Sequence, residues 1–157
     1  MGVACAVLGA LVLALPILGT DLAARRSDER AIRAGSSQAL AAADTALAAV
    51  FSYRWRSFAA HLGQVRGLLT PSFARSYLAT EGRATEPTAT RERAGVTAVV
   101  RKSALASAGS SASTVLIFLD EMTTTAGHPV ARTSGRSLLV TVRRSGSTWL
   151  ISGIVAK

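Results

Sequence analysis

The feature that most constrains the fold is a change in the spacing of apolar residues near Ala94. Before this residue, apolar side chains recur every three or four positions, which is typical of amphipathic helices. After it, apolar and polar side chains alternate, which is typical of strands with one buried face. Helices followed by a run of strands indicate an α+β domain, in which the helices cover one face of a sheet.

The helical half predicts three helices. The first is expected from about Ser37 to Tyr53, because this segment is rich in alanine, the best helix former. The second is expected over Trp55–Leu69, where apolar residues lie three and four positions apart. Thr70-Pro71 is typical of a helix N-cap followed by proline at the first helical position. It predicts a third, short helix that reaches about Thr80 and can end at Gly82. Residues 83–93, which include Pro87, are expected to form either a polar connection or a frayed helix.

Four strands are expected in the second half of the chain, over residues 96–106, 113–125, 138–143 and 148–155. The third of them either begins at Leu138 or extends back to about Arg132. The segments between them are rich in glycine and serine, which favour turns. Consecutive strands joined by short turns form an antiparallel meander. We therefore predict a four-stranded antiparallel sheet with about three helices on one face.

The first 20 residues, Met1–Thr20, contain no charged side chain. As a helix they would span roughly 30 Å, the thickness of a membrane's hydrocarbon core. A cleaved signal peptide is the alternative, but the basic residues and small-x-small cleavage site of such a peptide are missing. We predict a transmembrane anchor over residues 1–20, a juxtamembrane helix or linker over residues 21–36 and a folded domain over residues 37–157.

The chain is strongly basic, with 18 basic and 9 acidic residues and a net charge of +9. Such an excess favours an anionic partner, either nucleic acid or a membrane surface, although charge spread over solvated faces is the alternative. No aromatic residues interleave with the basic pair Arg143-Arg144, so we expect no specific nucleic-acid site. The arginines that follow the apolar run are expected to contact lipid headgroups: Arg25, Arg26, Arg30 and Arg33. By the positive-inside rule these arginines alone would keep the domain in the cytoplasm.

The sequence contains no motif typical of a catalytic or metal centre, and no cofactor is expected. A single cysteine, Cys5, allows no intramolecular disulfide. Adjacent strand residues point to opposite faces, so Asp120 and Glu121 cannot form a catalytic pair, and we interpret them as a solvated strand end. His61 is interpreted as a residue at the rim of its helix. Asp44 lies in an apolar helical segment, where it is either a buried base or an exposed helix residue.

Three segments, in this order behind an apolar N-terminus, resemble the Mce-associated membrane proteins. These are bacterial accessory proteins of Mce (mammalian cell entry) lipid-import systems. The segments are LLTPSF with a tyrosine four residues later at Leu68–Tyr77, VLIFLDEMTTT at Val115–Thr125 and GSTWLIS at Gly146–Ser152. The resemblance covers about residues 37–155 and depends on the combination of the three segments.

The resemblance implies an NTF2-like cone, in which three helices wrap a curved antiparallel sheet. It also implies a non-enzymatic, single-pass protein of the bacterial plasma membrane, with its domain outside, that supports assembly or stability of an Mce-type lipid or sterol import system. The expected partners are Mce transporter subunits or other membrane accessory proteins, together with the anionic membrane surface. The implied outside location disagrees with the local charges.

A second class of function remains open, because NTF2-like folds also host small-molecule binders and isomerase-like enzymes. Such a function would use the cavity of the cone. The side chains expected to line this cavity are Tyr53, Phe58, Tyr77, Phe118 and Trp149.

The alanine-rich segment also suggests a place for a partner protein. A helix lies on a sheet by one stripe of side chains, here Leu40, Leu47 and Phe51, so the opposite alanines would remain available. Small side chains allow another helix to approach closely. The predicted partner interface consists of Ala42, Ala46 and Ala49.

Overall fold

The computed structural model describes residue 30 and residues 32–157. Its contacts divide the chain into two units, Met1–Ala34 and Gly35–Lys157. The expected transmembrane anchor and two of the expected headgroup contacts, Arg25 and Arg26, lie outside the described residues. In the part of the chain that is described, none of the helices is long and apolar enough to cross a membrane.

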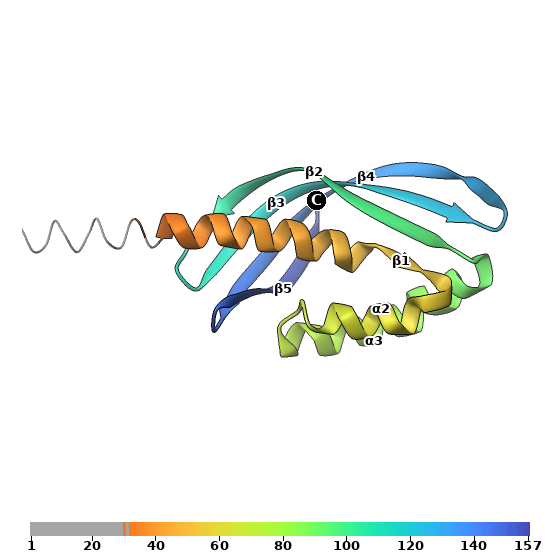
Figure 1. Cartoon of the computed structure of the whole chain (residues 1–157), viewed down its shortest axis with the longest axis horizontal. Helices are drawn as coiled ribbons and strands as arrows, with labels where there is room; N and C mark the ends of the chain where they lie inside the picture. Colours follow the sequence, from red (N-terminus) through yellow and green to blue (C-terminus); the bar gives the residue numbers. More distant parts are fainter. Residues whose placement is uncertain (1–29, 31) are drawn as a thin grey trace, which may run out of the picture. The chain divides into compact units, whose positions relative to one another are not determined.

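The unit Gly35–Lys157 is an α+β domain built on one antiparallel sheet (Figure 1). The strands follow each other in chain order across the sheet. They are β1 (Tyr53–Arg54), β2 (Gly95–Ser107), β3 (Ala112–Thr125), β4 (His128–Ser145) and β5 (Thr148–Ala156). The predicted α+β class and antiparallel meander are confirmed.

The sheet has five strands rather than the four expected. The additional strand, β1, contains two residues, and its Tyr53 pairs with Val96 of β2. Two residues are too few to show an alternating pattern, so β1 leaves no periodic signal in the sequence. Its position beside β2 is decided by pairing across the fold.

Three helices accompany the sheet, as predicted. The alanine-rich helix covers residues 32–51 of the described chain. A 3-10 turn, η1 (Trp55–Ser57), leads into α2 (Phe58–Arg66), and α3 covers Pro71–Glu92. Thr70 occupies the N-cap position of α3, in agreement with the sequence pattern.

The third helix is longer than predicted, because α3 continues through Gly82 and Pro87 and ends only after Glu92. A glycine inside a helix costs about 1 kcal/mol, which packing can offset. Gly82 faces α2, where an added Cβ would lie 4.0 Å from the side chain of Leu62. The helix ends at Arg93, whose left-handed φ of 52° stops the helical hydrogen bonding.

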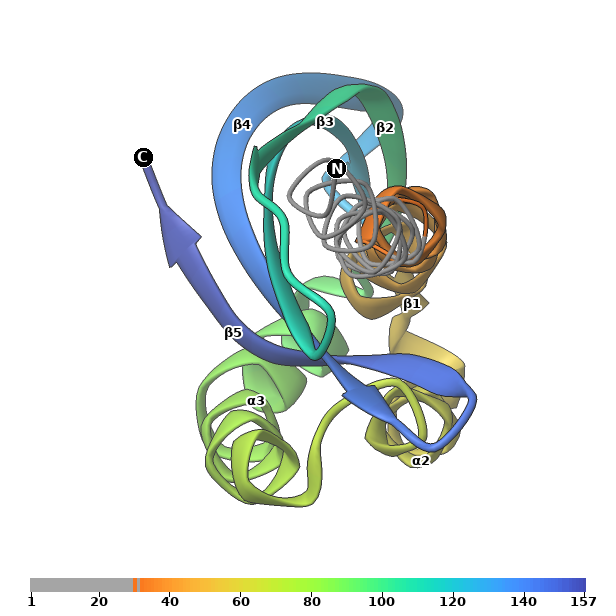
Figure 2. The same cartoon turned by 90° about the vertical axis from the view of Figure 1, so that its left-hand side faces the viewer.

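The sheet is strongly curled, and β2, β3 and β4 bend over the alanine-rich helix (Figure 2). Register shifts increase the local twist of the sheet. They lie in β2, between Val100 and Lys102 and between Leu105 and Ser107, and in β5, where Ser152 is the extra residue opposite Thr141 and Val142. Together with the three helices, this curled sheet forms the cone that the sequence resemblance implied.

The main core lies between the concave face of the sheet and the alanine-rich helix. Ala39, Ala43 and Leu47 are completely buried there. They pack against inward-facing strand residues such as Ile117 and Ile151. The expected stripe is confirmed at Leu47, whereas Leu40 and Phe51 are only partly buried and the residues just before them in the helix take the buried positions.

Candidate functional site

A cavity of about 410 Å³ lies between the paired helices α2 and α3 and the sheet. This volume falls within the range of roughly 300–1,000 Å³ that is common for small-molecule sites. Every strand except β5 contributes to the lining, together with the end of the alanine-rich helix. The aromatic and charged members of the lining are Tyr53, Phe58, His61, Tyr77, Glu81, Glu92, Glu121 and Arg136.

Three rings form one wall of the cavity. Phe58 and His61 lie one turn apart on α2, and their ring centroids are 5.8 Å apart. Tyr53 on β1 meets Phe58 edge to face, with ring centroids 5.0 Å apart and planes inclined by 77°. The ring of Tyr53 also lies 6.0 Å from that of His61. The pairing of β1 with β2 thus places a tyrosine over two rings of α2.

Burial keeps the titratable rings of the cavity uncharged near neutral pH. It raises the pKa of Tyr77 well above the ordinary 10.0, and the charges of Glu81 and Glu121 raise it further. The pKa of Tyr53 is raised by burial and by the same two carboxylates. Burial lowers the pKa of His61 below its ordinary 6.5. The two phenols can therefore donate hydrogen bonds into the cavity, and the imidazole carries no charge.

An ion pair with a buried carboxylate lies on the sheet side of the cavity. Glu121 of β3 is 7% exposed, and its Oε2 lies 2.8 Å from Nε of Arg136 on β4. The expectation of a solvated strand end is wrong for Glu121. Asp120 points to the opposite, outer face of the sheet, where it forms an ion pair with Arg101 at 2.7 Å. Alternation along β3 therefore gives two adjacent carboxylates different surroundings.

Three of the five side chains expected to line a cavity do so: Tyr53, Phe58 and Tyr77. Phe118 lies on the outer face of the sheet and is 45% exposed, because its neighbours Ile117 and Leu119 take the inward positions of β3. Trp149 is buried in the main core, away from the cavity lining.

Sequence reasoning did not assign the charged residues of the cavity or His61 to this site. Two signals were present. Tyr77 and Glu81 are four residues apart on one helix and therefore share a face. Glu121 shares its side of β3 with the buried Leu119.

The three alanines of the predicted partner interface have different surroundings. Ala46 is buried in the core, Ala42 is partly buried, and Ala49 is exposed. Asp44, on the same helix, is partly buried and lies outside the cavity lining. Its Oδ2 accepts a hydrogen bond of 2.8 Å from Ser103, and its Oδ1 is buried without a partner among the described residues.

The remaining predicted contacts stay predictions. Arg30 and Arg33 are exposed, and their contact with lipid headgroups is untested. Within residue 30 and residues 32–157, no three potential metal ligands come together.

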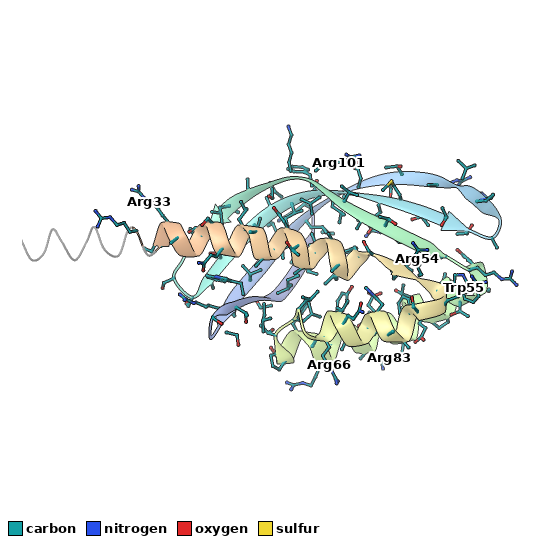
Figure 3. All side chains as sticks on the ribbon, in the orientation of Figure 1. Arg33, Arg54, Trp55, Arg66, Arg83 and Arg101 are labelled. Carbon is teal, nitrogen blue, oxygen red and sulfur yellow. The ribbon has the colours of Figure 1, made fainter. Side chains whose placement is uncertain are left out.

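The outer face of the sheet carries an apolar row across three strands, in which two side chains are exposed and Leu116 and Leu139 are partly buried. Leu116 of β3 pairs with Leu139 of β4, which pairs with Val155 of β5. Val155 is 58% exposed, and the exposed ring of Phe118 lies two residues from Leu116. We call these four residues the outer apolar row. Arg101 projects from the outer side of the sheet, whereas Arg66 and Arg83 project from the helical layer (Figure 3).

No family model matches the chain, and none of the curated proteins matches it. Solved structures share its fold. An IcmL-like type IV secretion system protein from Legionella pneumophila superposes with a TM-score of 0.67 at 8% identity, over 77% of this chain and 91% of that chain. The periplasmic domain of DotI gives a TM-score of 0.65 at 15% identity, over 75% and 91% of the two chains.

A third structure is CagV, a VirB8 homologue of the type IV secretion system of Helicobacter pylori. It gives a TM-score of 0.55 at 12% identity, over 74% of this chain and 97% of that chain. At these identities the similarity shows a common fold.

These findings contradict the resemblance to Mce-associated membrane proteins, and the expectation of a role in Mce lipid import is wrong with it. The IcmL-like protein and CagV are type IV secretion proteins. The three segments that suggested the resemblance reflect local structure instead. They correspond to the start of α3, the inner strand β3, and the turn at Gly146 with β5.

Proposed function

We propose that this chain is a non-enzymatic structural subunit of a protein complex in the bacterial cell envelope, comparable to type IV secretion components. The observation that carries the proposal is the shared cone, which aligns over about three quarters of this chain with an IcmL-like protein and with a DotI domain. The DotI domain is periplasmic. This supports a domain outside the cytoplasmic membrane, held by an anchor in the uncharged run Met1–Thr20.

The outer apolar row is the surface that we assign to contacts with other subunits. Isolated apolar side chains on a surface are common, but contiguous exposed ones are typical of interaction sites. The row joins three strands, and a rigid sheet holds its side chains in fixed positions. Lys102 pairs with Phe118 and adds a charged group beside the row. An apolar centre with charged groups at its border is the usual anatomy of a protein interface.

The test is capture of partners from membranes of the native host after crosslinking. The double substitution of Phe118 and Val155 by serine should abolish co-purification of other membrane subunits. Both side chains are exposed, so the free energy of unfolding should change by less than about 0.5 kcal/mol per site.

Val130→Ser is the matched control, because Val130 is 81% exposed but lies far from the row along β4. It should leave co-purification unchanged. Unchanged capture by the double variant would contradict the assigned surface. Capture of no envelope subunit by the unmodified chain would contradict the proposed function itself.

A further inference from the structure

The cavity is acidic although the protein is basic. The chain has 18 basic and 9 acidic residues, whereas the lining contains Glu81, Glu92 and Glu121 against the single basic residue Arg136. Glu121 and Arg136 compensate each other. Among the lining residues that the structure describes, Glu81 and Glu92 therefore have no basic counterpart. A concave site with excess negative charge attracts cations and repels anions.

The aromatic wall offers a second kind of attraction for a cation. The face of an aromatic ring is electrically negative and attracts an ammonium group within about 6 Å of its centroid. Tyr53 and Phe58 meet edge to face, so their faces point in different directions, as in the walls of a cage. Tyr77 adds another ring from α3, on the opposite helix of the pair.

Glu81 lies among these rings. Its charge acts on the pKa of Tyr53, of Tyr77 and of His61, which are contributed by β1, α3 and α2. Glu81 is itself one of the residues that line the cavity. Glu81 is also one turn from Tyr77 on α3, so the carboxylate and the ring share a face.

We propose that this cavity binds a small organic cation, namely an ammonium ion that carries an apolar group. The aromatic rings and Glu81 hold the ammonium group, while apolar lining such as Val50, Leu62 and Ala89 receives the rest of the molecule. The volume of about 410 Å³ limits the ligand to small molecules. This site lies on the concave side of the sheet, so the proposal goes beyond the assembly role and is independent of it.

The test is titration of the purified full chain with benzyltrimethylammonium chloride. Calorimetry measures the heat of binding, and NMR monitors the signals of the His61 ring. Benzyl alcohol, which has the same ring without the charge, is the neutral control ligand. We expect saturable binding of the cation with a shift of the His61 signals, and no saturable binding of the alcohol.

Glu81→Gln removes the charge and keeps the shape, and it should weaken the Kd for the cation at least about fivefold. Glu86→Gln is the matched control, because Glu86 lies on the same helix, is also partly buried and is not part of the lining. It should leave the Kd within about twofold. Tyr77→Phe keeps the ring face, and it should also bind within about twofold of the unmodified chain.

Three results would each overturn the proposal. They are an absence of saturable cation binding, equal binding of the cation and the alcohol, and equal weakening by Glu81→Gln and Glu86→Gln. Neither substitution removes a core side chain, so circular dichroism should show the same folded signal for both variants. The capture experiment on the outer apolar row does not involve the cavity, and the two proposals can therefore fail separately.

Discussion

The two ends of the concave face of the sheet differ in what fills them. At one end, the alanine-rich helix lies directly on the strands, and its contact residues Ala39, Ala43 and Leu47 are completely buried. At the other end, α2 and α3 enclose a cavity of about 410 Å³. Strand β3 runs through both ends. Its inward side chains are Val115, Ile117 and Leu119 in the packed region, and Glu121 and Thr123 at the cavity.

The difference follows from side-chain size and polarity. Alanine lets a helix backbone approach a sheet closely, so branched strand residues fill the remaining space and exclude water. Carboxylates and phenol hydroxyl groups cannot pack in this way, because each polar atom needs a partner or solvent. The packed end therefore contributes most to the stability of the fold, whereas the cavity end presents polar and aromatic groups that a ligand can contact.

The largest expected effect is the loss of a buried leucine at the packed end. Leu47→Ala should lower the free energy of unfolding by about 2–5 kcal/mol, because it removes a completely buried side chain and leaves a void. Leu62→Ala is the matched change at the cavity end, where the side chain is only partly buried, and it should cost about 1 kcal/mol or less. Chemical denaturation measures both. Equal losses would show that the two ends are packed alike.

A smaller effect is expected from breaking the ion pair at the cavity. Arg136→Met leaves the carboxylate of Glu121 buried without its partner, which should cost about 1–2 kcal/mol, less than for a fully buried pair because Arg136 is half exposed. Adding Glu121→Gln should recover part of the loss. Thermal denaturation of the single and double variants measures the coupling. If the double variant unfolds at the same temperature as Arg136→Met alone, Arg136 does not stabilise the buried carboxylate of Glu121.

The smallest effect concerns the tyrosines and is seen only at high pH. Burial raises the pKa of Tyr77 and of Tyr53 in the folded chain above the ordinary 10.0, so the folded state holds these protons more tightly than the unfolded state. Their contribution to stability is complete below about pH 10 and is lost as the pH rises toward the folded pKa.

The loss is at most about 1.4 kcal/mol per pH unit for each tyrosine, so Tyr77→Phe should make stability fall less steeply above pH 10. Denaturation curves between pH 8 and about pH 11 measure the two slopes. At pH 8, where the phenol of Tyr77 is protonated, the unmodified chain and Tyr77→Phe should have similar free energies of unfolding. Identical slopes at high pH would mean that the phenol of Tyr77 is not buried.

The alternation and the turns made most of the sheet predictable. The expected strand over residues 113–125 and the observed β3, Ala112–Thr125, differ by one residue at the start. The expected strand over residues 138–143, with its alternative start near Arg132, is shorter than β4, which begins at His128. The additional residues 128–136 are exposed and mostly polar, so they show no buried face. These residues belong to strand β4 because they pair with β3; Arg132, for example, pairs with Thr123.

The candidate site was predictable only in its aromatic members. Tyr53, Phe58 and Tyr77 are large and partly apolar, which marks them for an interior surface. The sequence does not indicate that the charged members are buried, because a carboxylate such as Glu81 or Glu121 is normally solvated. Whether a charge is buried depends on what lies opposite, and the partner of Glu121 lies 15 residues away on another strand.

The sequence by itself determined the α+β class, the order of helices before strands and the meander, because these follow from local periodicity and turn residues. The tertiary structure alone decided that Phe118 faces outward while Glu121 faces inward. It also decided that α3 continues past Gly82, and that β1 brings Tyr53 over α2. The physical reason is that burial and pairing are relations between distant segments, and a local pattern carries no information about the segment that will lie opposite.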